Sequence, residues 1–451
     1  MRWRPKGPAP ASLWRDPQFV RCWAGSAVSQ MGDRVSEVAV PLIAVGLLHA
    51  SAAQVSWLTA LAWAPNLLAT VLGVWVDGLP GKRRLLIVTD LVRAGVLLTV
   101  PVTYWCGVLT LGQLYAVTLL VGLAGVPASC AWAPFFAHLV PRAAYVDANS
   151  RFSAARSFSF VAGPALGGGL VQALTAPVAV AADALSFLGS ALLLRRITAD
   201  APKPTGQRGS VRGSLLPGAR EGFAFVARQP VVRAGLGCAT TLNFFTFLTG
   251  TGLVVLFADR DLRLSPGVIG LALGVGASGS LVGALAAPRL ARSIGVGRVV
   301  MVGAVLFPAP FAAMALAGGP VWVRVGVLGG AEFLMGLGVM LFDVGLNSLK
   351  AAVIPDGLRA RVAGAYSTVN YGVRPLGALA GGALAETVGL RATFVVAAGG
   401  GVLSLLWLLP SPVPRLRSLD QLPSAAAQEE VGRGRKVAGG LAGADGERRS
   451  V

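Results

Sequence analysis

The sequence predicts an all-α membrane protein with twelve transmembrane helices in two pseudo-symmetric six-helix bundles. Of its 451 residues, 54% are hydrophobic and only 13% are charged, about half the charged share that is typical of soluble domains. The mean hydropathy of +0.68 agrees with this composition. Apolar stretches of membrane-spanning length recur along the chain, and several landmarks repeat between its two halves.

Each apolar stretch is long enough to cross a bilayer core of about 30 Å as a helix, because a helix satisfies its own backbone hydrogen bonds there. The chain begins with a polar, basic segment that lacks the apolar core of a signal peptide. The expected spans are 19–46, 54–76, 85–107, 112–136, 152–174, 177–194, 231–257, 266–288, 298–317, 321–347, 362–385 and 390–409.

The basic residues indicate which loops face the cytoplasm. The net charge is +19, and most Lys and Arg residues lie in the two tails and in alternate loops. The opposite loops hold only Arg260, Arg263, Arg324 and Arg391. By the positive-inside rule, we expect a multi-pass protein of the bacterial inner (plasma) membrane with both termini in the cytoplasm. The positive charge therefore indicates topology and does not suggest a nucleic-acid partner, because no groove-reading cationic face is evident.

These features divide the chain into five parts. Residues 195–230 are rich in Pro, Gly, Ser and Arg, and predict a flexible cytoplasmic linker that ends in a surface helix. The polar, Gly- and Ala-rich residues 410–451 predict a disordered cytoplasmic tail. The remaining parts are a cytoplasmic N-terminal tail and the two six-helix bundles, at 1–18, 19–194 and 231–409.

An internal repeat relates the two bundles. Three pairs of residues lie at equivalent places in each half and are separated by nearly the same number of residues. The pairs are Gly73 with Gly283, Pro141 with Pro355, and Pro164 with Pro375. A duplicated six-helix unit is typical of transporters in which two bundles rock around a central site.

Two short stretches connect this architecture with a known family. Residues 73–90 read GVWVDGLPGKRRLLIVTD, and residues 163–168 read GPALGG. The first resembles the loop signature that follows the second helix in the major facilitator superfamily, and the second resembles its fifth-helix antiporter signature. With SQMGDRVSEVAVPLIAV at residues 29–45, the chain is most similar to the bacterial efflux branch that includes macrolide and siderophore (enterobactin-type) exporters.

The resemblance implies a gating role for the loop between the second and third spans. Asp77 is expected to contact the end of the eleventh helix and to hold the cytoplasmic side shut in the outward-facing state. Lys82, Arg83 and Arg84 have an alternative role as anchors to anionic lipid headgroups. Asp90 and Arg93 are one helical turn apart and are expected to form a local pair. The gating-loop candidates are Gly73, Asp77, Gly81, Lys82, Arg83, Arg84, Asp90 and Arg93.

The fifth-helix motif consists of small residues around a proline, which remove side-chain bulk and one backbone N–H from the helix. The resemblance implies a bend that seals the cavity against leak in exporters. Close helix packing is an alternative that is compatible with this role. The motif residues are Gly163, Pro164, Gly167 and Gly168.

Ionisable residues inside the spans are the main candidates for proton coupling, because charge is costly within a bilayer. Asp33 and Glu37 lie four residues apart and share a helix face. Two carboxylates together in a low-dielectric medium favour proton uptake by one of them. Alternatively, Arg34 neutralises Asp33. Further candidates are Glu332, Asp343 and Arg374, whereas Asp183 is expected to cap a helix or to pair locally.

Large apolar side chains near the middle of the spans are candidates for lining an apolar substrate cavity, with lipid-facing or packing roles as the alternative. These candidates are Trp63, Trp132, Phe244, Phe245, Phe247, Met335 and Phe342. The four cysteines are scattered and the two histidines lie at helix ends, so that neither a metal site nor a cofactor is expected.

The resemblance implies alternating-access efflux of a bulky amphipathic organic compound, such as a drug, an antibiotic or a siderophore. Asp33 and Glu37 suggest that this efflux occurs in exchange for protons. We expect a monomer in the lipid bilayer with a small-molecule substrate. A nutrient or metabolite symporter of the same fold and a non-transporting membrane scaffold or sensor are the alternatives. An enzyme is not expected, because the sequence has no nucleophile–base–acid set and no nucleotide loop.

Overall fold

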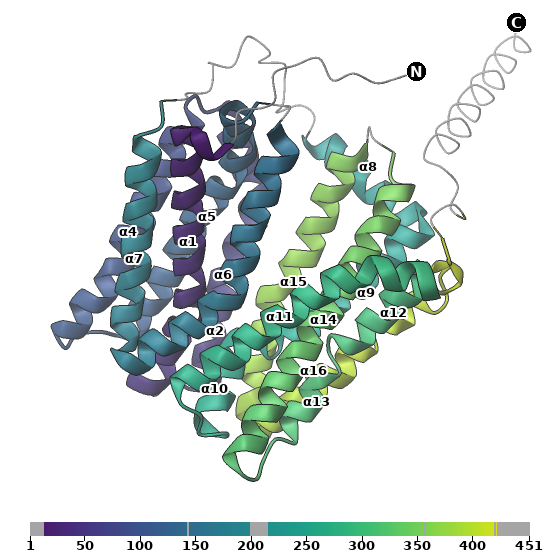
Figure 1. Ribbon diagram of the computed structural model, residues 1–451. Coiled ribbons are helices and arrows are strands. Elements are labelled where there is room, and N and C mark those ends of the chain that lie inside the picture. The colour runs from purple at the N-terminus through teal and green to yellow at the C-terminus, as the bar shows by residue number, and fades with distance from the viewer. Residues whose placement is uncertain (1–12, 142–143, 199–214, 356–357, 419–420, 422–451) are drawn as a thin grey trace, which may run out of the picture.

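The computed structural model describes residues 13–141, 144–198, 215–355, 358–418 and 421. These residues are almost entirely helical, and none of them forms a β-strand. Figure 1 shows two groups of helices side by side, α1 to α7 in purple to blue and α8 to α16 in teal to yellow. The predicted all-α fold class is confirmed.

The first group begins with helices whose ends are capped by side chains. Asp16 accepts a hydrogen bond of 2.9 Å from the Gln18 N–H, and Ser51 forms a capping box with Gln54. Gly81, with a φ of +75°, makes the sharp turn between α3 and α4. The helices are α1 (Pro17–Leu42), α2 (Ala52–Trp63), α3 (Ala69–Gly78), α4 (Lys82–Trp105), α5 (Leu111–Leu139), α6 (Tyr145–Ala173) and α7 (Ala176–Arg195).

The second group contains α8 (Leu215–Arg228), α9 (Pro230–Phe247), α10 (Gly250–Arg260), α11 (Pro266–Ile294), α12 (Val296–Leu306), α13 (Pro310–Ala315), α14 (Val321–Val353), α15 (Arg359–Val388), α16 (Leu390–Val402) and α17 (Leu405–Leu408). The apolar spans expected at 54–76, 231–257, 298–317 and 390–409 are each divided into two helices. A 3₁₀ segment with Pro65 separates α2 from α3, Gly250 with a φ of +48° begins α10, and Pro310 begins α13.

Among the described residues, eight helical stretches are long and apolar enough to cross a membrane. They include α4, α5, α7, α11 and α14, and the broken stretches that pair α9 with α10, α12 with α13 and α16 with α17. The other long helices, α1, α6 and α15, carry charged residues within their length, such as Asp33, Arg156 and Arg374. The protein is therefore a multi-pass helical membrane protein.

The two groups meet mainly through α6 against α11 and through α2 against α15. The sequence repeat relates α6 to α15 through Pro164 and Pro375, and relates α3, which continues α2, to α11 through Gly73 and Gly283. In the first contact α6 meets α11, and in the second contact the equivalents of these two helices, α15 and α2, meet each other. A twofold relation between the halves requires this pattern of contacts.

The groups are held together at the end of the molecule opposite α8. There, the Ser51 hydroxyl donates to Glu386 of α15, and Arg260 donates a 2.8 Å hydrogen bond to the Ala50 carbonyl. At the end that carries α8, which we call the α8 side, the groups diverge (Figure 1). The hydrophobic core that spans both groups accordingly includes residues of α1, α7, α10, α11 and α16.

Two segments outside the long helices are also ordered. The expected surface helix of the linker is α8, which lies across the start of α15 with an ion pair between Glu221 and Arg361. The expectation of disorder from residue 410 was wrong for its first part, because Val413 and Leu416 pack on α12. The Gly297 N–H donates a 3.0 Å hydrogen bond to the Leu416 carbonyl. The rest of both segments, 199–214 and 422–451, lies outside the described residues.

Candidate functional site

Three adjoining hollows lie within and between the two groups of helices. The N lobe, of about 380 Å³, is lined mainly by α1, α2 and α5 of the first group, and the C lobe, of about 360 Å³, by α9, α14 and α15 of the second. A middle lobe of about 230 Å³ joins them. It shares Arg34, Glu37 and Thr251 with the N lobe, and Phe307 and Val339 with the C lobe. The three lobes therefore lie next to one another, and we refer to them together as the central cavity, which is bordered by residues of both halves.

Glu37 and Arg34 form an ion pair in the wall between the N lobe and the middle lobe. The Arg34 Nη1 lies 2.5 Å from the Glu37 Oε2, and the guanidinium lies 4.1 Å from the centroid of the Phe160 ring. Both side chains are partly accessible, at 29% and 42%. Arg34 thus forms its ion pair with Glu37, and it also lies close enough to Asp33 to attract it electrostatically.

Asp33 instead belongs to a buried polar cluster formed by α1, α4 and α7. Among the basic side chains, Arg93 exerts the strongest electrostatic attraction on Asp33, and it also attracts Asp90 and Asp183. Asp183 is 1% exposed and accepts hydrogen bonds from Ser36 and, at 3.2 Å, from Ser186. Three carboxylates thus lie within electrostatic range of one guanidinium inside the first group of helices, without a described ion pair of 4 Å or less to it.

Arg93 lies within this cluster and not in a local pair. Its guanidinium is 4.9 Å from the centroid of the Phe187 ring, and its buried Nε has no hydrogen-bond partner among the described residues. No ion pair of 4 Å or less joins Arg93 to Asp90 in the described part of the chain. The expectation of such a pair was wrong, because Arg93 extends toward α5, where a Cβ on Gly125 would lie 2.2 Å from its Nη2.

The C lobe contains two basic residues and one acidic residue. Arg374 Nε donates a 2.8 Å hydrogen bond to Asn243, whose amide donates a 3.0 Å bond to Asn370. Lys350 Nζ lies 4.0 Å from the centroid of the Tyr366 ring. Asp343 is exposed to the lobe, and no ion pair of 4 Å or less joins it to either basic residue.

Trp63 and Arg374 form a contact between the two halves. The Arg374 guanidinium lies 4.2 Å from the Trp63 ring centroid, 4.4 Å from that of Tyr371 and 5.0 Å from that of Phe247. Trp63 lines the N lobe and Arg374 lines the C lobe. This aromatic cage holds the arginine at the boundary between the lobes, where its charge remains accessible.

The middle lobe carries a further carboxylate, Glu332 of α14. A Cβ on Gly276 of α11 would lie 2.9 Å from the Glu332 Oε2, which shows how closely the two helices approach. None of the described residues forms a hydrogen bond or an ion pair with Glu332. An ionisable residue at such a position is a candidate for function, because burial without a partner is costly.

The aromatic and methionine candidates fall into two sets. Trp63, Phe247, Met335 and Phe342 line the lobes of the central cavity. The other candidates pack elsewhere. Trp132 lies 5.2 Å from Phe152, centroid to centroid, in a cluster near the start of α6, and Phe245 packs against Gly400 with Phe244 beside it.

The turn between α3 and α4 contains two basic residues that bond to helix ends. Lys82 is buried, and its Nζ donates to the carbonyl of Val76 and, at 3.0 Å, to that of Leu79. Arg83 donates to the carbonyl of Ile197, just beyond the end of α7. Cations at helix C-termini satisfy free carbonyls and oppose the helix dipole.

Of the remaining gating-loop candidates, the structure describes the surroundings of Gly73 and Arg84 but not the side chain of Asp77. Arg84 is exposed, and Gly73 lies in α3 against α5, where a Cβ would stand 3.7 Å from the Cys130 sulfur. Asp77 occupies the last turn of α3, but its side chain lies outside the described part of the structure. The expected latch between Asp77 and the eleventh helix therefore stays a prediction.

The glycines of the GPALGG motif bring α6 close to two other helices. A Cβ on Gly163 would lie 2.3 Å from the Arg34 Cβ, and one on Gly167 would lie 3.0 Å from the Val35 Cα, both on α1. Gly168 faces α11 of the other half, where Pro266 and Gly270 leave no room for a side chain. The motif therefore packs one helix against both α1 and the opposite group.

Sequence reasoning missed several residues of the cavity. Asp183 was expected to make only local contacts, but it faces Asp33 across the interface of α1 and α7. Asn243, Lys350 and Tyr366 were not considered. Polar residues within apolar spans were the available signal, since they rarely face lipid. In the described part of the chain, no group of acidic, cysteine and histidine residues could hold a metal ion.

The fold and the cavity together define a class of protein: a helical membrane transporter with a central cavity between two related halves, and not an enzyme. Residues 9–434 match the family described as "Transmembrane secretion effector". The chain belongs to this family of the major facilitator superfamily.

Individual proteins agree with this assignment. The chain is 30% identical over 429 residues to the "Multidrug efflux pump Tap" of Mycobacterium tuberculosis, covering 93% of this chain and 98% of the relative. In fold it is similar to the nucleoside transporter NupG, with a TM-score of 0.68 and 13% identity over 90% of this chain and 100% of that one. A bacterial homologue of the iron transporter ferroportin in its inward-facing state gives a TM-score of 0.67 and 18% identity, over 89% and 99% of the two chains.

Proposed function

We propose that this protein is an efflux transporter of the bacterial inner membrane that exports bulky amphipathic organic compounds by alternating access, in exchange for protons. The observation that carries the proposal is the polar cluster of Asp33, Asp90, Asp183 and Arg93, of which Asp33 and Asp183 line the N lobe of the central cavity. The similarity to a multidrug efflux pump over nearly the full length of both chains supports the direction of transport and the breadth of substrates.

We also propose twelve membrane crossings. In this arrangement α2 with α3, α9 with α10, α12 with α13, and α16 with α17 each form one crossing, so that six crossings precede α8 and six follow it. The resulting parts are an N-terminal tail (1–18), bundles at 19–194 and 231–409, and a linker at 195–230. The excess of Lys and Arg in the loops on the α8 side supports a cytoplasmic position for this side and for both termini.

The arrangement of the hollows supports alternating access. The C lobe adjoins a further hollow of about 320 Å³ toward the α8 side, with which it shares Asn347, Lys350 and Tyr366. At the opposite end, the contacts of Ser51 with Glu386 and of α6 with α11 hold the halves together. This is the arrangement expected when a transporter is open to the cytoplasm, and a monomer suffices for it.

The charge of the N lobe supports the proposal of proton exchange. A buried cluster with more carboxylates than cations is stabilised when a carboxylate takes up a proton. We propose that Asp33 carries the transported proton together with Asp183, and that Glu37 responds through its ion pair with Arg34. Proton release to one side and uptake from the other would then accompany the rocking of the halves.

The test uses purified protein in proteoliposomes with an internal pH indicator and a panel of amphipathic dyes and antibiotics. We expect substrate addition to drive proton movement, and we expect loss of this response in the double variant Asp33→Asn, Glu37→Gln. Asp147→Asn changes an exposed carboxylate far from the cavity and serves as the matched control. Unchanged pH-dependent transport in the double variant would show the proton assignment to be wrong, and substrate accumulation by whole cells would show a symporter.

A further inference from the structure

The central cavity has charges of opposite sign at its two ends. The side chains that line the N lobe include three carboxylates, those of Asp33, Glu37 and Asp183, and one guanidinium, that of Arg34. The C lobe is lined by two cations, Arg374 and Lys350, and by one carboxylate, Asp343. The formal charge therefore changes from negative to positive across the cavity.

The positive charge of Arg374 is available to a ligand. Its Nε bonds to Asn243, but no described residue accepts a hydrogen bond from its two terminal nitrogens, and no described carboxylate lies within 4 Å. Three aromatic rings hold the guanidinium in place. Lys350, in the same lobe, is also without an ion pair among the described side chains.

The negative charge of the N lobe is also incompletely neutralised. Arg34 pairs with Glu37 and also attracts Asp33, while Arg93 is shared among Asp33, Asp90 and Asp183. Among the described residues, no ion pair of 4 Å or less joins a cation to Asp33 or Asp183. A cationic group in the N lobe would therefore be attracted to carboxylates that have no ion-pair partner of their own.

The walls between the charged ends carry large apolar side chains beside the carboxylate of Glu332. Trp63 and Leu58 line the N lobe, Met335 and Leu273 line the middle lobe, and Phe247 lines the C lobe. Such walls suit a ligand with an aromatic or alicyclic body. An apolar body with a single charge of either sign would place that charge correctly at one end only, and would leave the other end of the cavity unmatched.

We propose that the preferred substrates are zwitterions with a cationic group and a carboxylate or similar anionic group on opposite sides of an apolar body. The anionic group binds Arg374 with Lys350, and the cationic group binds the N lobe at Asp33 and Asp183. This assignment rests on the proposed transport function and specifies its substrate class. In this arrangement, each half of the protein binds one end of the substrate.

Three dyes with a similar fused-ring body test the proposal. Rhodamine B carries a cationic ring system and a free carboxylate, its ethyl ester carries only the cation, and fluorescein carries only negative charge. Fluorescence anisotropy measures their equilibrium binding to the full-length protein in lipid nanodiscs, with empty nanodiscs as the blank. We expect rhodamine B to bind at least about tenfold more tightly than either of the other dyes, as a single matched charge pair in a poorly hydrated site provides.

Substitutions test which residues cause the preference for the zwitterionic dye. Arg374→Gln is expected to weaken rhodamine B about tenfold and to leave the ester unchanged, and Lys350→Gln is expected to act in the same direction. Arg374→Lys is expected to retain most of the preference and keeps the test decisive if Arg374→Gln does not fold. Arg289→Gln, at an exposed arginine of α11 that bonds only to its own helix, is the control.

The outcomes separate this inference from the proposed function. Binding of the ester or of fluorescein as tightly as rhodamine B would overturn it, as would an Arg374→Gln variant with the wild-type preference or the absence of binding by all three dyes. The measurement needs neither transport nor a proton gradient. A preserved charge preference without dye-driven proton movement would leave the substrate class standing and refute proton exchange alone.

Discussion

Gly168 of α6 and Gly270 of α11 lie so close that a Cβ added to Gly168 would stand 2.9 Å from the Gly270 Cα and 2.3 Å from the Pro266 carbonyl oxygen. This contact joins the two halves at the end opposite α8. Because the obstructing atoms belong to the backbone, they cannot move aside as a flexible side chain would. A single methyl group at position 168 therefore tests how tightly the halves must close.

We expect Gly168→Ala to destabilise this arrangement by about 1–3 kcal/mol, as overpacking typically does. Gly169→Ala is the matched control, since a Cβ there would meet nothing within 4 Å. Thermal unfolding of the purified proteins and transport of a common substrate should both distinguish the two variants. Equal unfolding temperatures would mean that α6 and α11 do not pack as described.

Lys82→Gln is expected to destabilise the protein by about 1.5–3 kcal/mol, because the buried ammonium bonds two carbonyls at the end of α3. Arg84→Gln removes the same charge from an exposed neighbour and should have little effect. Chemical denaturation in mild detergent compares the variants. If both substitutions lower the free energy of unfolding by the same amount, the loop cations act only through their charge, as anchors to lipid headgroups.

Arg93→Gln is expected to cost about 3–5 kcal/mol, because it leaves Asp33, Asp90 and Asp183 without their shared cation. The second substitution Asp183→Asn in the same chain should recover part of this loss by removing one buried negative charge. Arg156→Gln, at an exposed arginine of α6, is the control. The absence of any recovery in the double variant would argue against a shared electrostatic cluster.

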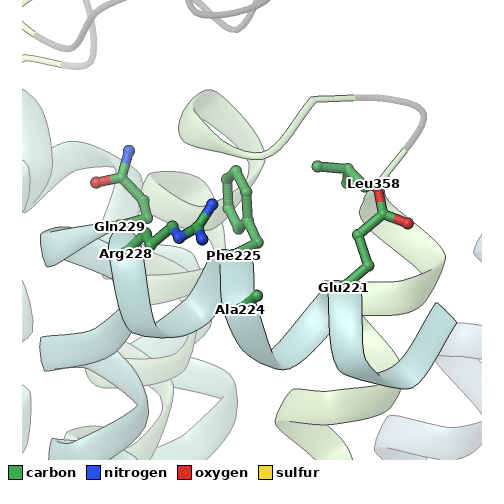
Figure 2. Close-up of a pocket in the computed structure, with 6 residues that line it drawn as sticks. All are labelled: Glu221, Ala224, Phe225, Arg228, Gln229 and Leu358. Atoms are coloured by element: carbon green, nitrogen blue, oxygen red, sulfur yellow. The ribbon is translucent and has the colours of Figure 1, made fainter. Parts of the chain in front are cut away.

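Gly222→Val is expected to displace α8, because a Cβ at Gly222 would lie 2.4 Å from the Arg361 carbonyl oxygen. Figure 2 shows the neighbouring pocket, in which Glu221 and Phe225 of α8 face the segment that carries Leu358. Glu221→Gln should change little, since an exposed ion pair contributes about 0–1 kcal/mol. Hydrogen exchange of the α8 amides measures both effects, and equal protection in the two variants would contradict this packing.

Asp77→Asn is expected to slow transport several-fold while leaving membrane insertion intact, if Asp77 holds the two halves together in one state. The amount of protein in the membrane fraction and the initial rate of dye efflux measure the two properties. Asp147→Asn, at an exposed carboxylate in the first turn of α6, provides the comparison. A full transport rate would reduce this loop to a marker of topology.

The sequence alone was sufficient for the broad description. Apolar spans and charge-poor composition identified an all-α membrane protein, and the GPALGG and loop stretches identified the major facilitator superfamily, which the family match confirmed. These features are local or compositional, because a membrane helix needs only a run of apolar residues. The breaks at Gly250 and Pro310 were missed, since an apolar run does not reveal where its helix is interrupted.

The charged residues show where sequence reasoning stops. Asp33, Arg34 and Glu37 were identified as charged residues within one helix, but their spacing left open which of them pair. Packing of α1 against α6 and α7 brings Arg34 beside Phe160 and Asp33 toward Asp183. Side chains three or four residues apart on a helix are all neighbours, so only the surrounding helices could select among them.

By itself, the sequence determined the class of the protein, its family and the set of ionisable residues within its helices. Only the tertiary structure decided that Trp63 of one half cages Arg374 of the other and that opposite charges line the two lobes of one cavity. These relationships join helices about 300 residues apart in the chain. They depend on helix rotation and close approach at small residues, which no local sequence pattern specifies.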